Sequence, residues 1–598
     1  MASIIKRSEV DPRYTWATED LFPTDADWLD SYAALQSAPQ QLCVYQGRLG
    51  ESAATLLEYF KLSDEIGRKL ERLFNYAARK GDEDTANGTY QDFRGKAMNL
   101  VVAIQSATSF DVPELLGLSD ETVEAFFAAE PGLGIYRRRM DVIRRRRAHI
   151  LSPAEEALLA SAGEMAHTAQ SIFGAFENAD LRFPEAADSS GKLHTLTAGT
   201  LVSLLESSDR VLRKNAFEAC YNTFHSFRNS IAAMLEGQVK QLIWHSRARK
   251  YPSTLDAALD GTEVPTAVYH NLINAVHANM EKLHRYGELR KKLMGLDELH
   301  MYDLYTPIVA DANMPITYEE AKEMVLEALQ PLGSEYCAML EEGFANRWID
   351  VYENEGKRSG AYSSCGDPHP YVLLNHKDNL NSAFTLAHEM GHALHTYHSN
   401  LAQPYATADY VIFVAEVAST CNEVLLMQHL LRKTSDKRQR AYLINYFLEQ
   451  FRTTLYRQTM FAEFELKVNQ LAEQGQSLTA DLLSQEYAKL NAAYYGEAVV
   501  QDPGIAMEWA RIPHFYYNYY VFQYATGFSA AIAIAMNILK NGAPAVEAYR
   551  KFLSSGCSDT PVELLKIAGV DMSTPQPVNE ALALFDQLMD EMEQLLAE

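Results

Sequence analysis

Apolar residues recur every three or four positions through most of the chain, the spacing that places them on one face of an α-helix. The stretch 52–80 shows this pattern clearly. The stretch 151–176 opens with Ser152 as N-cap, Pro153 at the first helical position and Glu155 closing a capping box. Similar helical patterns occur at 265–294, 317–347, 411–431, 438–473, 478–493 and 573–597. The sequence therefore predicts a mostly α-helical protein.

Patterns typical of β-strands are few. The segments "DLRFP" (180–184) and "KLHTLT" (192–197) predict a short hairpin around "ADSSGK". The run "YVLLNH" (371–376) follows the breaker-rich "CGDPHP" and is the strongest strand candidate. A boundary after the hairpin would divide the chain into an N-terminal helical lobe, 1–204, and a larger region, 205–598.

Composition and charge narrow the range of partners. A length of 598 residues predicts more than one lobe. The 47% of hydrophobic and 22% of charged residues are ordinary for a soluble globular protein. The formal net charge of −26 argues against nucleic acid or an anionic membrane as the main partner, because such polyanions would be repelled.

Targeting signals and cysteine spacing both favour the cytoplasm. Residues 1–16 carry no apolar segment of the kind found in secretory signals, and no run of 18 apolar residues predicts a membrane-spanning helix. The most apolar window, 527–539, predicts a buried helix instead. Six cysteines are scattered without CxxC spacing, as expected for reduced thiols.

Four histidines crowd into the stretch "LAHEMGHALHTYHS": His388, His392, His395 and His398. Each residue of a helix turns by about 100°. Three of the four imidazoles therefore share one stripe, and spacing alone leaves open which of them bind a metal.

The HExxH pattern gives a chemical reason to choose two of them. His388 and His392, four residues apart, can direct adjacent imidazoles at one tetrahedral zinc ion, and Glu389 is placed to take a proton from water at the metal. Gly391 and Ala393 would leave room for close approach to the site. An exposed helix with a satisfied histidine pair is the alternative. The small and apolar flanking residues predict a buried helix instead, in which these polar groups need partners.

A catalytic zinc site needs a third protein ligand and an open position. The helix is expected to break at Pro404, and a second helix to begin near Val411. Its acidic residues Glu416 and Glu423 lie seven apart and hence on one face. Glu416, 24 residues past His392, could return to the motif as a ligand, although an ordinary helix carboxylate is the alternative. Glu423 is better suited to orient one of the histidines.

These motifs resemble a known family. "HEMGHALH" followed by "FVAEVASTCNE", together with "YTWATEDLFPT", "AYSSCGDPHPYVLLNH", "FRTTLYRQTMFAEFE" and "RIPHFYYNYYVFQYATG", looks like the oligoendopeptidase F branch of the thimet-oligopeptidase-like (M3) zinc metallopeptidases. The resemblance implies one zinc ion held by His388, His392 and Glu416, with Glu389 as catalytic base. The two other histidines then become neighbours of the site. It further implies a two-lobed helical shell around a deep channel, with a small β-sheet edge beside the HExxH helix.

The tyrosine-rich stretch "HFYYNYYVFQY", which begins at His514, is the second unusual passage. On a helix, His514, Tyr517, Tyr520 or Val521, and Tyr524 would form a stripe with polar tips. An aromatic core helix is the alternative. Hydroxyl and imidazole donors facing a metal site could stabilise the oxyanion of amide hydrolysis. Enzymes that this chain resembles use a His and Tyr hydroxyls from the corresponding segment, which implies His514, Tyr517 and Tyr524. The assignment among the tyrosines stays open, because the segment is richer in Tyr than thimet-type sequences.

The strand "YVLLN" (371–375) could pair through its backbone with an extended substrate, which would give broad specificity. A plain core strand is the alternative. Cys365 and His369, in the preceding loop, are expected to be inert.

Together these features predict a mostly helical, cytoplasmic zinc endopeptidase that cleaves internal bonds of short peptides. Two alternatives remain: a zinc carboxypeptidase or aminopeptidase, and a non-catalytic helical scaffold that binds peptides. Peptide preference and oligomeric state are beyond what the sequence predicts.

Overall fold

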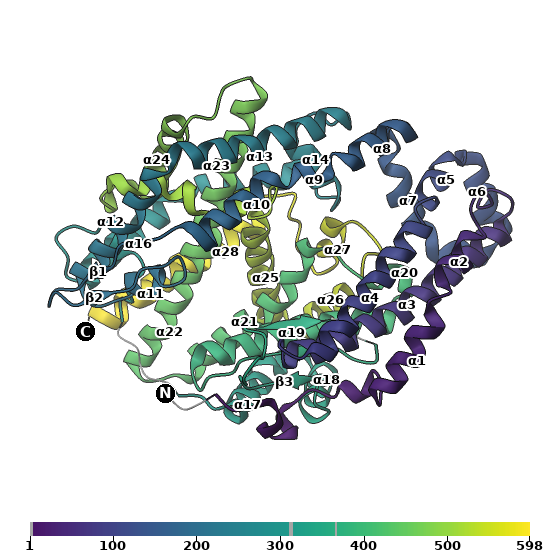
Figure 1. Cartoon of the computed structure of the whole chain (residues 1–598). Helices are drawn as coiled ribbons and strands as arrows, with labels where there is room; N and C mark the ends of the chain where they lie inside the picture. Colours follow the sequence, from purple (N-terminus) through teal and green to yellow (C-terminus); the bar gives the residue numbers. More distant parts are fainter. Residues whose placement is uncertain (1–3, 310–314, 365–366, 598) are drawn as a thin grey trace. The chain divides into compact units, whose positions relative to one another are not determined.

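The computed structural model describes residues 4–309, 315–364 and 367–597, and their regular structure is almost entirely helical, as predicted (Figure 1). The chain divides into two compact units, each built from three stretches. The first unit comprises Met1–Ala148, Asn313–His429 and Ile534–Val570, and the second comprises His149–Ala312, Leu430–Ala533 and Asp571–Glu598. The two-lobe division expected at 204/205 stays a prediction, because these units are groups of contacting residues rather than continuous stretches of sequence.

The first unit contains the helices α1 (Asp25–Leu35), α2 (Ala38–Cys43), α3 (Ala53–Glu83), α4 (Gly88–Ala107), α5 (Asp111–Gly117), α6 (Asp120–Ala129), α7 (Arg137–Arg145), α17 (Tyr318–Leu329), α18 (Ser334–Ala345), α19 (Leu380–Ala402), α20 (Tyr405–Ala408), α26 (Ala543–Leu553) and α27 (Pro561–Ile567). The unit boundaries fall inside α21 (Ile412–Lys433) and α25 (Phe522–Asn541).

The second unit contains the helices α8 (Pro153–Ser161), α9 (Gly163–Ala166), α10 (Thr168–Ala175), α11 (Leu201–Leu205), α12 (Arg210–Ser226), α13 (Arg228–Ala248), α14 (Thr254–Asp260), α15 (Thr266–His277), α16 (Met280–Leu293), α22 (Lys437–Gln450), α23 (Arg457–Glu473), α24 (Ala480–Tyr495) and α28 (Gln576–Ala597). The described residues also form short 3₁₀ helices at Arg7–Glu9, Pro12–Tyr14, Thr18–Asp20, Pro131–Tyr136, Arg146–His149, Met301–Asp303, Gln330–Leu332, Gly496–Ala498, Pro503–Arg511 and Pro513–Tyr516, and π-helical turns at Phe176–Asp180 and Phe451–Tyr456.

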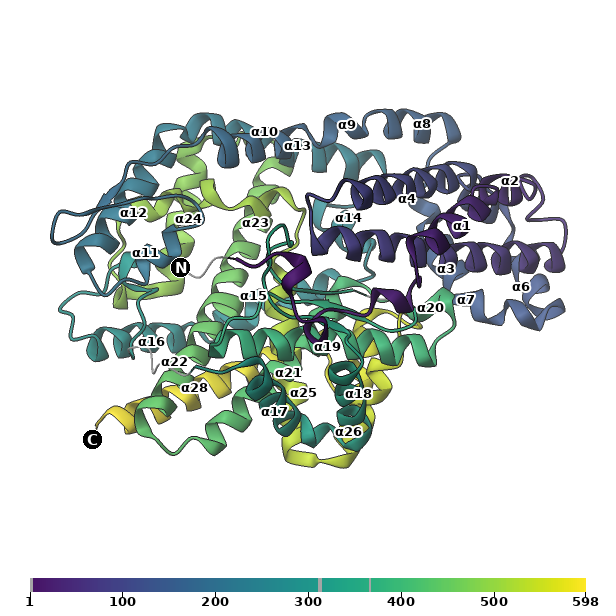
Figure 2. The same ribbon diagram turned by 60° about the horizontal axis from the view of Figure 1, so that its bottom comes forward.

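The core of the first unit forms around α3 and α4, which run side by side in both views (Figures 1 and 2). Helix α3 begins where the Ser52 hydroxyl accepts the Thr55 N–H, an N-cap that satisfies one free backbone donor. Its apolar stripe then buries Phe60 and Leu73 in a cluster that includes Trp28 of α1. The apolar face predicted from the sequence at 52–80 is therefore the face of α3 that packs in the core.

A three-stranded sheet lies beside α19 in the first unit, in the order β3 (Ile349–Asp350), β5 (Tyr371–Leu373), β4 (Tyr362–Ser364). Strand β5 pairs in parallel with β3 and antiparallel with β4, and all three of its residues are buried. The strand expected at 371–376 is confirmed. It is central in the sheet rather than an edge, so the sheet edge next to α19 belongs to β4.

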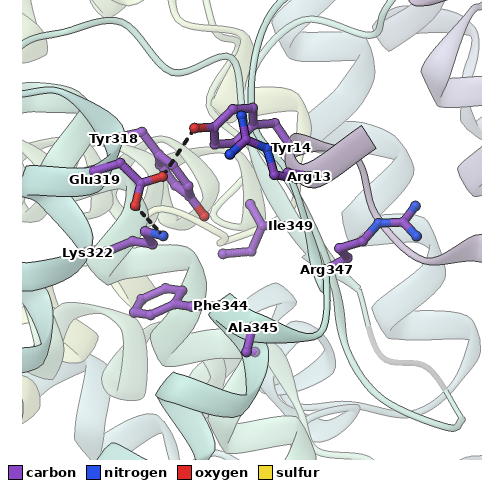
Figure 3. A pocket seen from close by; sticks show the side chains of 10 residues that line it. Arg13, Tyr14, Tyr318, Glu319, Lys322, Phe344, Ala345, Arg347 and Ile349 are labelled. Atoms are coloured by element: carbon purple, nitrogen blue, oxygen red, sulfur yellow. Dashed lines mark hydrogen bonds and ion pairs between the residues drawn. The ribbon is translucent and has the colours of Figure 1, made fainter. Parts of the chain in front are cut away.

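Backbone hydrogen bonds join the N-terminal segment to the residues on either side of β3. Val351 N–H donates to the Tyr14 carbonyl at 3.0 Å, and Ala17 N–H donates to the Arg347 carbonyl at 2.8 Å. A pocket of about 280 Å³ lies between this segment and α17 and α18 (Figure 3). Its polar side chains pair with one another, since Glu319 accepts from Tyr14 and binds Lys322 at 2.6 Å. The pocket therefore presents no unsatisfied charge from this group.

In the second unit, two sequence expectations needed correction. The hairpin around 188–192 is present, but its strands are β1 (Ala186–Ala187) and β2 (Leu193–His194), so the first strand lies after 180–184. The helical stretch 151–176 is broken into α8, α9 and α10, although the predicted Ser152–Glu155 capping box is formed.

Helix α25 is the one helix of the described residues that is long and apolar enough to cross a membrane by length and composition, and 72% of its apolar window is buried inside the protein. Burial of this kind is typical of a core helix. The sequence prediction of a buried helix at 527–539 agrees with this placement.

A buried ionic cluster joins several helices of the second unit. The carboxylate of Glu508 accepts hydrogen bonds from Arg457 at 2.6 Å, from Arg511 at 2.7 Å and from the Tyr487 hydroxyl. Burial alone would raise the pKa of Glu508, but the two guanidinium groups lower it to about 2. Because the folded-state pKa lies below the ordinary value, the cluster stabilises the fold above about pH 4.5, and this contribution is lost as the pH falls towards 2.

We expect Glu508→Gln to lower the free energy of unfolding at pH 7 by about 3 kcal/mol, because two partly buried guanidinium groups lose their counter-charge. Urea titrations followed by circular dichroism at pH 7, 4 and 3 measure this, and the difference from the native chain should shrink as the pH falls. Glu218→Gln, at an exposed pair with Lys214, is the control and should change the value by less than about 1 kcal/mol. A loss that does not depend on pH would contradict the assignment.

Candidate metal centre and active site

The HExxH motif lies in the middle of α19, a continuous helix of 23 residues. The helix begins at Asn379, whose side-chain oxygen accepts the Ser382 N–H at 2.9 Å. Buried residues recur along the helix from Leu380 to Ser399. The motif is thus held on a rigid and largely buried helix, as its flanking residues predicted.

Helix α21 packs directly against the motif (Figures 1 and 2). A Cβ added to Gly391 would lie 2.6 Å from the Cα of Ser419, so the absence of a side chain lets the two backbones approach. The Asn422 amide also donates to the Ala387 carbonyl at 3.1 Å. The sequence suggested that Gly391 makes room for the metal site; in the structure the space is taken by the backbone of α21.

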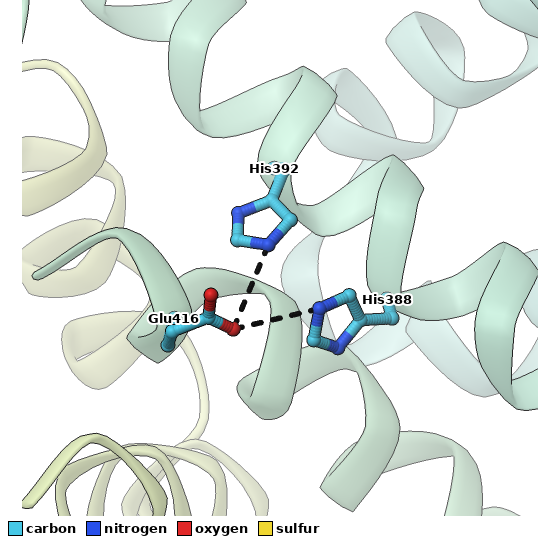
Figure 4. A group of neighbouring side chains, drawn as sticks. All are labelled: His388, His392 and Glu416. Carbon is cyan, nitrogen blue, oxygen red and sulfur yellow. Dashed lines mark ion pairs between the residues drawn. The ribbon is translucent and has the colours of Figure 1, made fainter. Parts of the chain in front are cut away.

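This close packing brings two histidines and a glutamate together (Figure 4). The Glu416 Oε2 atom lies 3.5 Å from His388 Nε2 and 3.7 Å from His392 Nε2, and the candidate ligand atoms all lie within 4.8 Å of one another. Ligands about 2 Å from a tetrahedral zinc ion are roughly 3.3 Å apart, so the group needs only small adjustments to hold one. His₂Glu is also a donor set that catalytic zinc sites use.

Hydrogen bonds behind the imidazoles fix their orientation. His388 Nδ1 donates to Glu423 Oε1 at 2.8 Å, and His392 is hydrogen-bonded to the backbone of Ala415. Both rings therefore direct Nε2 towards Glu416. Partners of this kind set the tautomer and the aim of metal-binding histidines, and the structure gives Glu423 the orienting contact expected from its position.

The electrostatics of the group favour a bound cation. Burial lowers the pKa of His392 to about 3, so this ring is neutral and its lone pair is free to bind. Burial also opposes a proton on His388, but the hydrogen bond and charge of Glu423 raise its pKa to about 9. Carboxylates thus create a negative potential around the two imidazoles, and a divalent cation can take the place of that proton.

Glu389 is only 7% exposed and adjoins the ligand group. Burial, with a smaller contribution from the charge of Glu416, raises the pKa of Glu389 to about 7, and its carboxylate is hydrogen-bonded to the backbone of Ser363 in β4. A carboxyl group with a pKa near neutrality can both accept and donate a proton. Strand β4 therefore positions Glu389, an HExxH residue whose pKa suits it to proton transfer.

The other two histidines of the cluster are core residues. His395 stacks on Tyr410 with ring centroids 3.8 Å apart, and His398 stacks on Tyr336 at 6.1 Å. Burial lowers the pKa of His395 to about 3 and that of His398 to about 4, so both are neutral. His369 is likewise packed, stacking on Trp348. Cys365 lies outside the described residues.

The tyrosine-rich segment does not form the predicted helix. A 3₁₀ turn ends at Tyr516, Asn518 and Tyr519 have φ of 55° and 56°, and α25 starts only at Phe522. The left-handed conformation at two successive residues interrupts the helix, which the helical stripe did not anticipate.

The predicted side chains nevertheless gather around one imidazole. The His514 ring centroid lies 5.4 Å from that of Tyr517 and 6.0 Å from that of Tyr524, and the Tyr524 hydroxyl lies 3.5 Å from His514 Nε2. Tyr520 joins the cluster at 6.3 Å, whereas Val521 is fully buried. Burial and then the charge of Arg457 lower the pKa of His514, so the ring is neutral near pH 7.

This aromatic group belongs to the second unit and the candidate ligands to the first, so the oxyanion role of His514, Tyr517 and Tyr524 stays a prediction. Sequence reasoning missed the contact of Ser363 with Glu389, because a backbone group leaves no side-chain signal. It also missed the approach of Ser419 to Gly391, for which the glycine itself was the available signal.

Comparison with known proteins identifies the family of the chain. Residues 203–584 match the model of peptidase family M3, and residues 114–183 match a model described as oligopeptidase F. The oligopeptidase PepF of Bacillus subtilis (strain 168) is 46% identical over 591 residues, which cover 99% of this chain and 88% of that protein. The group B oligopeptidase PepB of Streptococcus agalactiae is 40% identical over 592 residues, 99% of this chain and 98% of that one.

Solved structures give the same result. Oligoendopeptidase-F from Enterococcus faecium is 39% identical with a TM-score of 0.74, over 96% of this chain and 99% of that one. A crystal structure from Chlamydophila abortus is 35% identical with a TM-score of 0.92, over 99% of this chain and 100% of that one. The chain therefore belongs to peptidase family M3, in its oligoendopeptidase F branch.

Proposed function

We propose that the protein is a zinc-dependent oligoendopeptidase that hydrolyses internal bonds of short peptides in the cytoplasm. The observation that carries the proposal is the convergence of His388, His392 and Glu416, with Glu423 behind the first ligand. Family membership supports peptide hydrolysis, and the relatives, which are named oligopeptidases, support short substrates.

His388, His392 and Glu416 would hold the zinc ion, one per chain. When bound, zinc would polarise the scissile carbonyl and acidify water. Glu389 takes the proton of the attacking water and delivers it to the amide nitrogen that leaves. Its hydrogen bond with the backbone of Ser363 holds the carboxylate next to β4.

The sheet edge supplies a way to align an extended peptide. Since β5 is central, we assign backbone pairing with substrate to β4, the strand next to α19 that contains Ser363. Pairing through the backbone reads little side-chain identity, which fits a broad specificity. His514 and the hydroxyls of Tyr517 and Tyr524 would stabilise the oxyanion.

Metal dependence and the position of cleavage are tested together. We expect the purified protein to contain about one zinc ion per chain and to cleave internally quenched peptides whose two ends are blocked. A chelator should abolish cleavage, and added zinc should restore it, because the ligands remain folded around the site. Metal analysis and fluorescence measure the two quantities.

The same experiment separates the alternatives. The same peptides with free ends serve as a second set. An exopeptidase would cleave only this second set, and a scaffold would bind peptides of both sets and cleave neither. Either outcome would refute an endopeptidase.

A further inference from the structure

The backbone turn inside the tyrosine-rich segment is held by a buried carboxyl group from another helix. We propose that Glu465 of α23 is a positioning residue that fixes the turn at Asn518 and Tyr519, and through it the arrangement of His514 and its neighbouring tyrosines. The inference rests on the oxyanion role proposed above only for its effect on catalysis. The structural effect on the turn stands without that role.

The turn is a strained piece of backbone. Asn518 and Tyr519 both lie in the left-handed region, with φ of 55° and 56°. Asparagine enters this region more easily than most residues, but a bulky Tyr brings its Cβ close to backbone oxygen. Such conformations persist only where surrounding contacts enforce them, and they concentrate at functional sites.

Glu465 supplies an enforcing contact at the strained residue itself. Its Oε1 atom accepts the Tyr519 N–H at 2.6 Å, and the side chain is only 4% exposed. The Oε2 atom is buried and has no hydrogen-bond partner among the described residues. Burial raises the pKa of Glu465 to about 8, so the group is neutral at pH 7 and accepts the bond without bringing an unpaired charge into the core.

Two further contacts hold the Tyr519 side chain. Its hydroxyl lies 2.9 Å from the Thr254 hydroxyl of α14, and its ring packs edge-on against Tyr269 of α15 at 5.7 Å. With the backbone N–H on α23 and the ring between α14 and α15, Tyr519 cannot relax without breaking one of these contacts.

The position of this turn gives it a consequence for the cluster. His514 and Tyr517 precede it, whereas Tyr520 and Tyr524 follow it, yet their rings meet around one imidazole. The angle of the turn therefore determines how the two halves face each other. A displacement of about 1 Å in a catalytic group can reduce turnover by about 100-fold.

Two substitutions at residue 465 separate the hydrogen bond from the volume of the side chain. Glu465→Met keeps length and bulk but removes the acceptor, whereas Glu465→Gln keeps a carbonyl oxygen for the Tyr519 N–H. In the zinc-loaded full chain we expect Glu465→Met to lower kcat by about 10-fold or more with KM changed by less than about threefold. Amide hydrogen exchange should accelerate in peptides that cover 513–524. Glu465→Gln should retain kcat and protection.

A second pair acts on the turn from its exposed side, where folding is not at risk. Asn518→Ala disfavours the left-handed conformation and should accelerate exchange over 513–524, whereas Asn518→Gly tolerates it and should not. Combining Glu465→Met with Asn518→Gly should recover part of the lost protection. Unchanged exchange over 513–524 in Glu465→Met would overturn the proposal, and so would loss of protection throughout the second unit.

His514→Ala distinguishes this inference from the proposed function. If that variant keeps its kcat while Glu465→Met deprotects 513–524, the oxyanion role of His514 is wrong and the positioning role survives. If His514→Ala loses kcat while Glu465→Met leaves both exchange and kcat unchanged, the oxyanion role stands and the positioning role is refuted.

Discussion

Replacing Glu389 with Gln is expected to lower kcat for peptide cleavage by about 10²–10⁴-fold while one zinc ion per chain stays bound. The substitution keeps the shape and the hydrogen-bonding reach of the side chain, but an amide cannot accept the proton of the attacking water. The proposed ligands His388, His392 and Glu416 are untouched. Steady-state kinetics on an end-blocked quenched peptide and metal analysis of the same sample measure the two effects.

The matched control for this substitution is Glu323→Gln, at an exposed position of α17 outside the site. It should retain native kcat and zinc content. Loss of zinc from the Glu389 variant would assign the residue to the metal rather than to proton transfer. Retention of full turnover would mean that another group is the base.

Gly391→Ala should disrupt the metal centre without changing any proposed ligand. The added Cβ would lie 2.6 Å from Ser419 Cα and 2.8 Å from the Ala418 carbonyl oxygen, so α19 and α21 must separate. Glu416 lies one turn before Ser419 and would move away from the histidine pair. We expect zinc affinity to fall by about 100-fold and the free energy of unfolding to fall by about 1–3 kcal/mol. Chelator competition and urea titration measure these changes.

Gly95→Ala in α4 is the corresponding control, because no atom lies within 4 Å of the Cβ that it would add. Alanine is the better helix former, so this variant should be neutral or more stable by up to about 1 kcal/mol, with native zinc affinity. If Gly391→Ala binds zinc as tightly as the native chain does, the close approach of the helices is not what holds Glu416 in place.

Local patterns were sufficient for most of the helices and for the grouping of the candidate metal ligands. The period of 52–80 predicted α3 within a few residues, and HExxH with a carboxylate 24 residues later predicted the group that the structure brings together. Both predictions depend on spacing along one helix, or on the next helix packing back against it. The division of 151–176 into three helices was not predictable from a period that continues across the breaks.

Features that depend on distant partners were not predictable in this way. The sequence identified β5 as a strand, but its central place depends on β3 and β4, which pair with it from either side. The helix expected after His514 is replaced by a left-handed turn whose N–H binds Glu465, a residue 54 positions earlier. Only Asn518, a residue that tolerates this conformation, gave a local signal.

The first unit is built from three separate stretches of the chain, and this has a consequence for its biosynthesis. Residues 1–148 leave the ribosome long before Asn313–His429, to which the N-terminal segment is stitched, and before Ile534–Val570. The buried cluster around α3 and α4 comes almost wholly from residues 16–140, but Tyr371 and Leu373 can complete it only later, and nascent chains with exposed apolar surface are prone to aggregate. Translation has to pass residue 570 before this unit can close, so its maturation is late and expected to depend on chaperones.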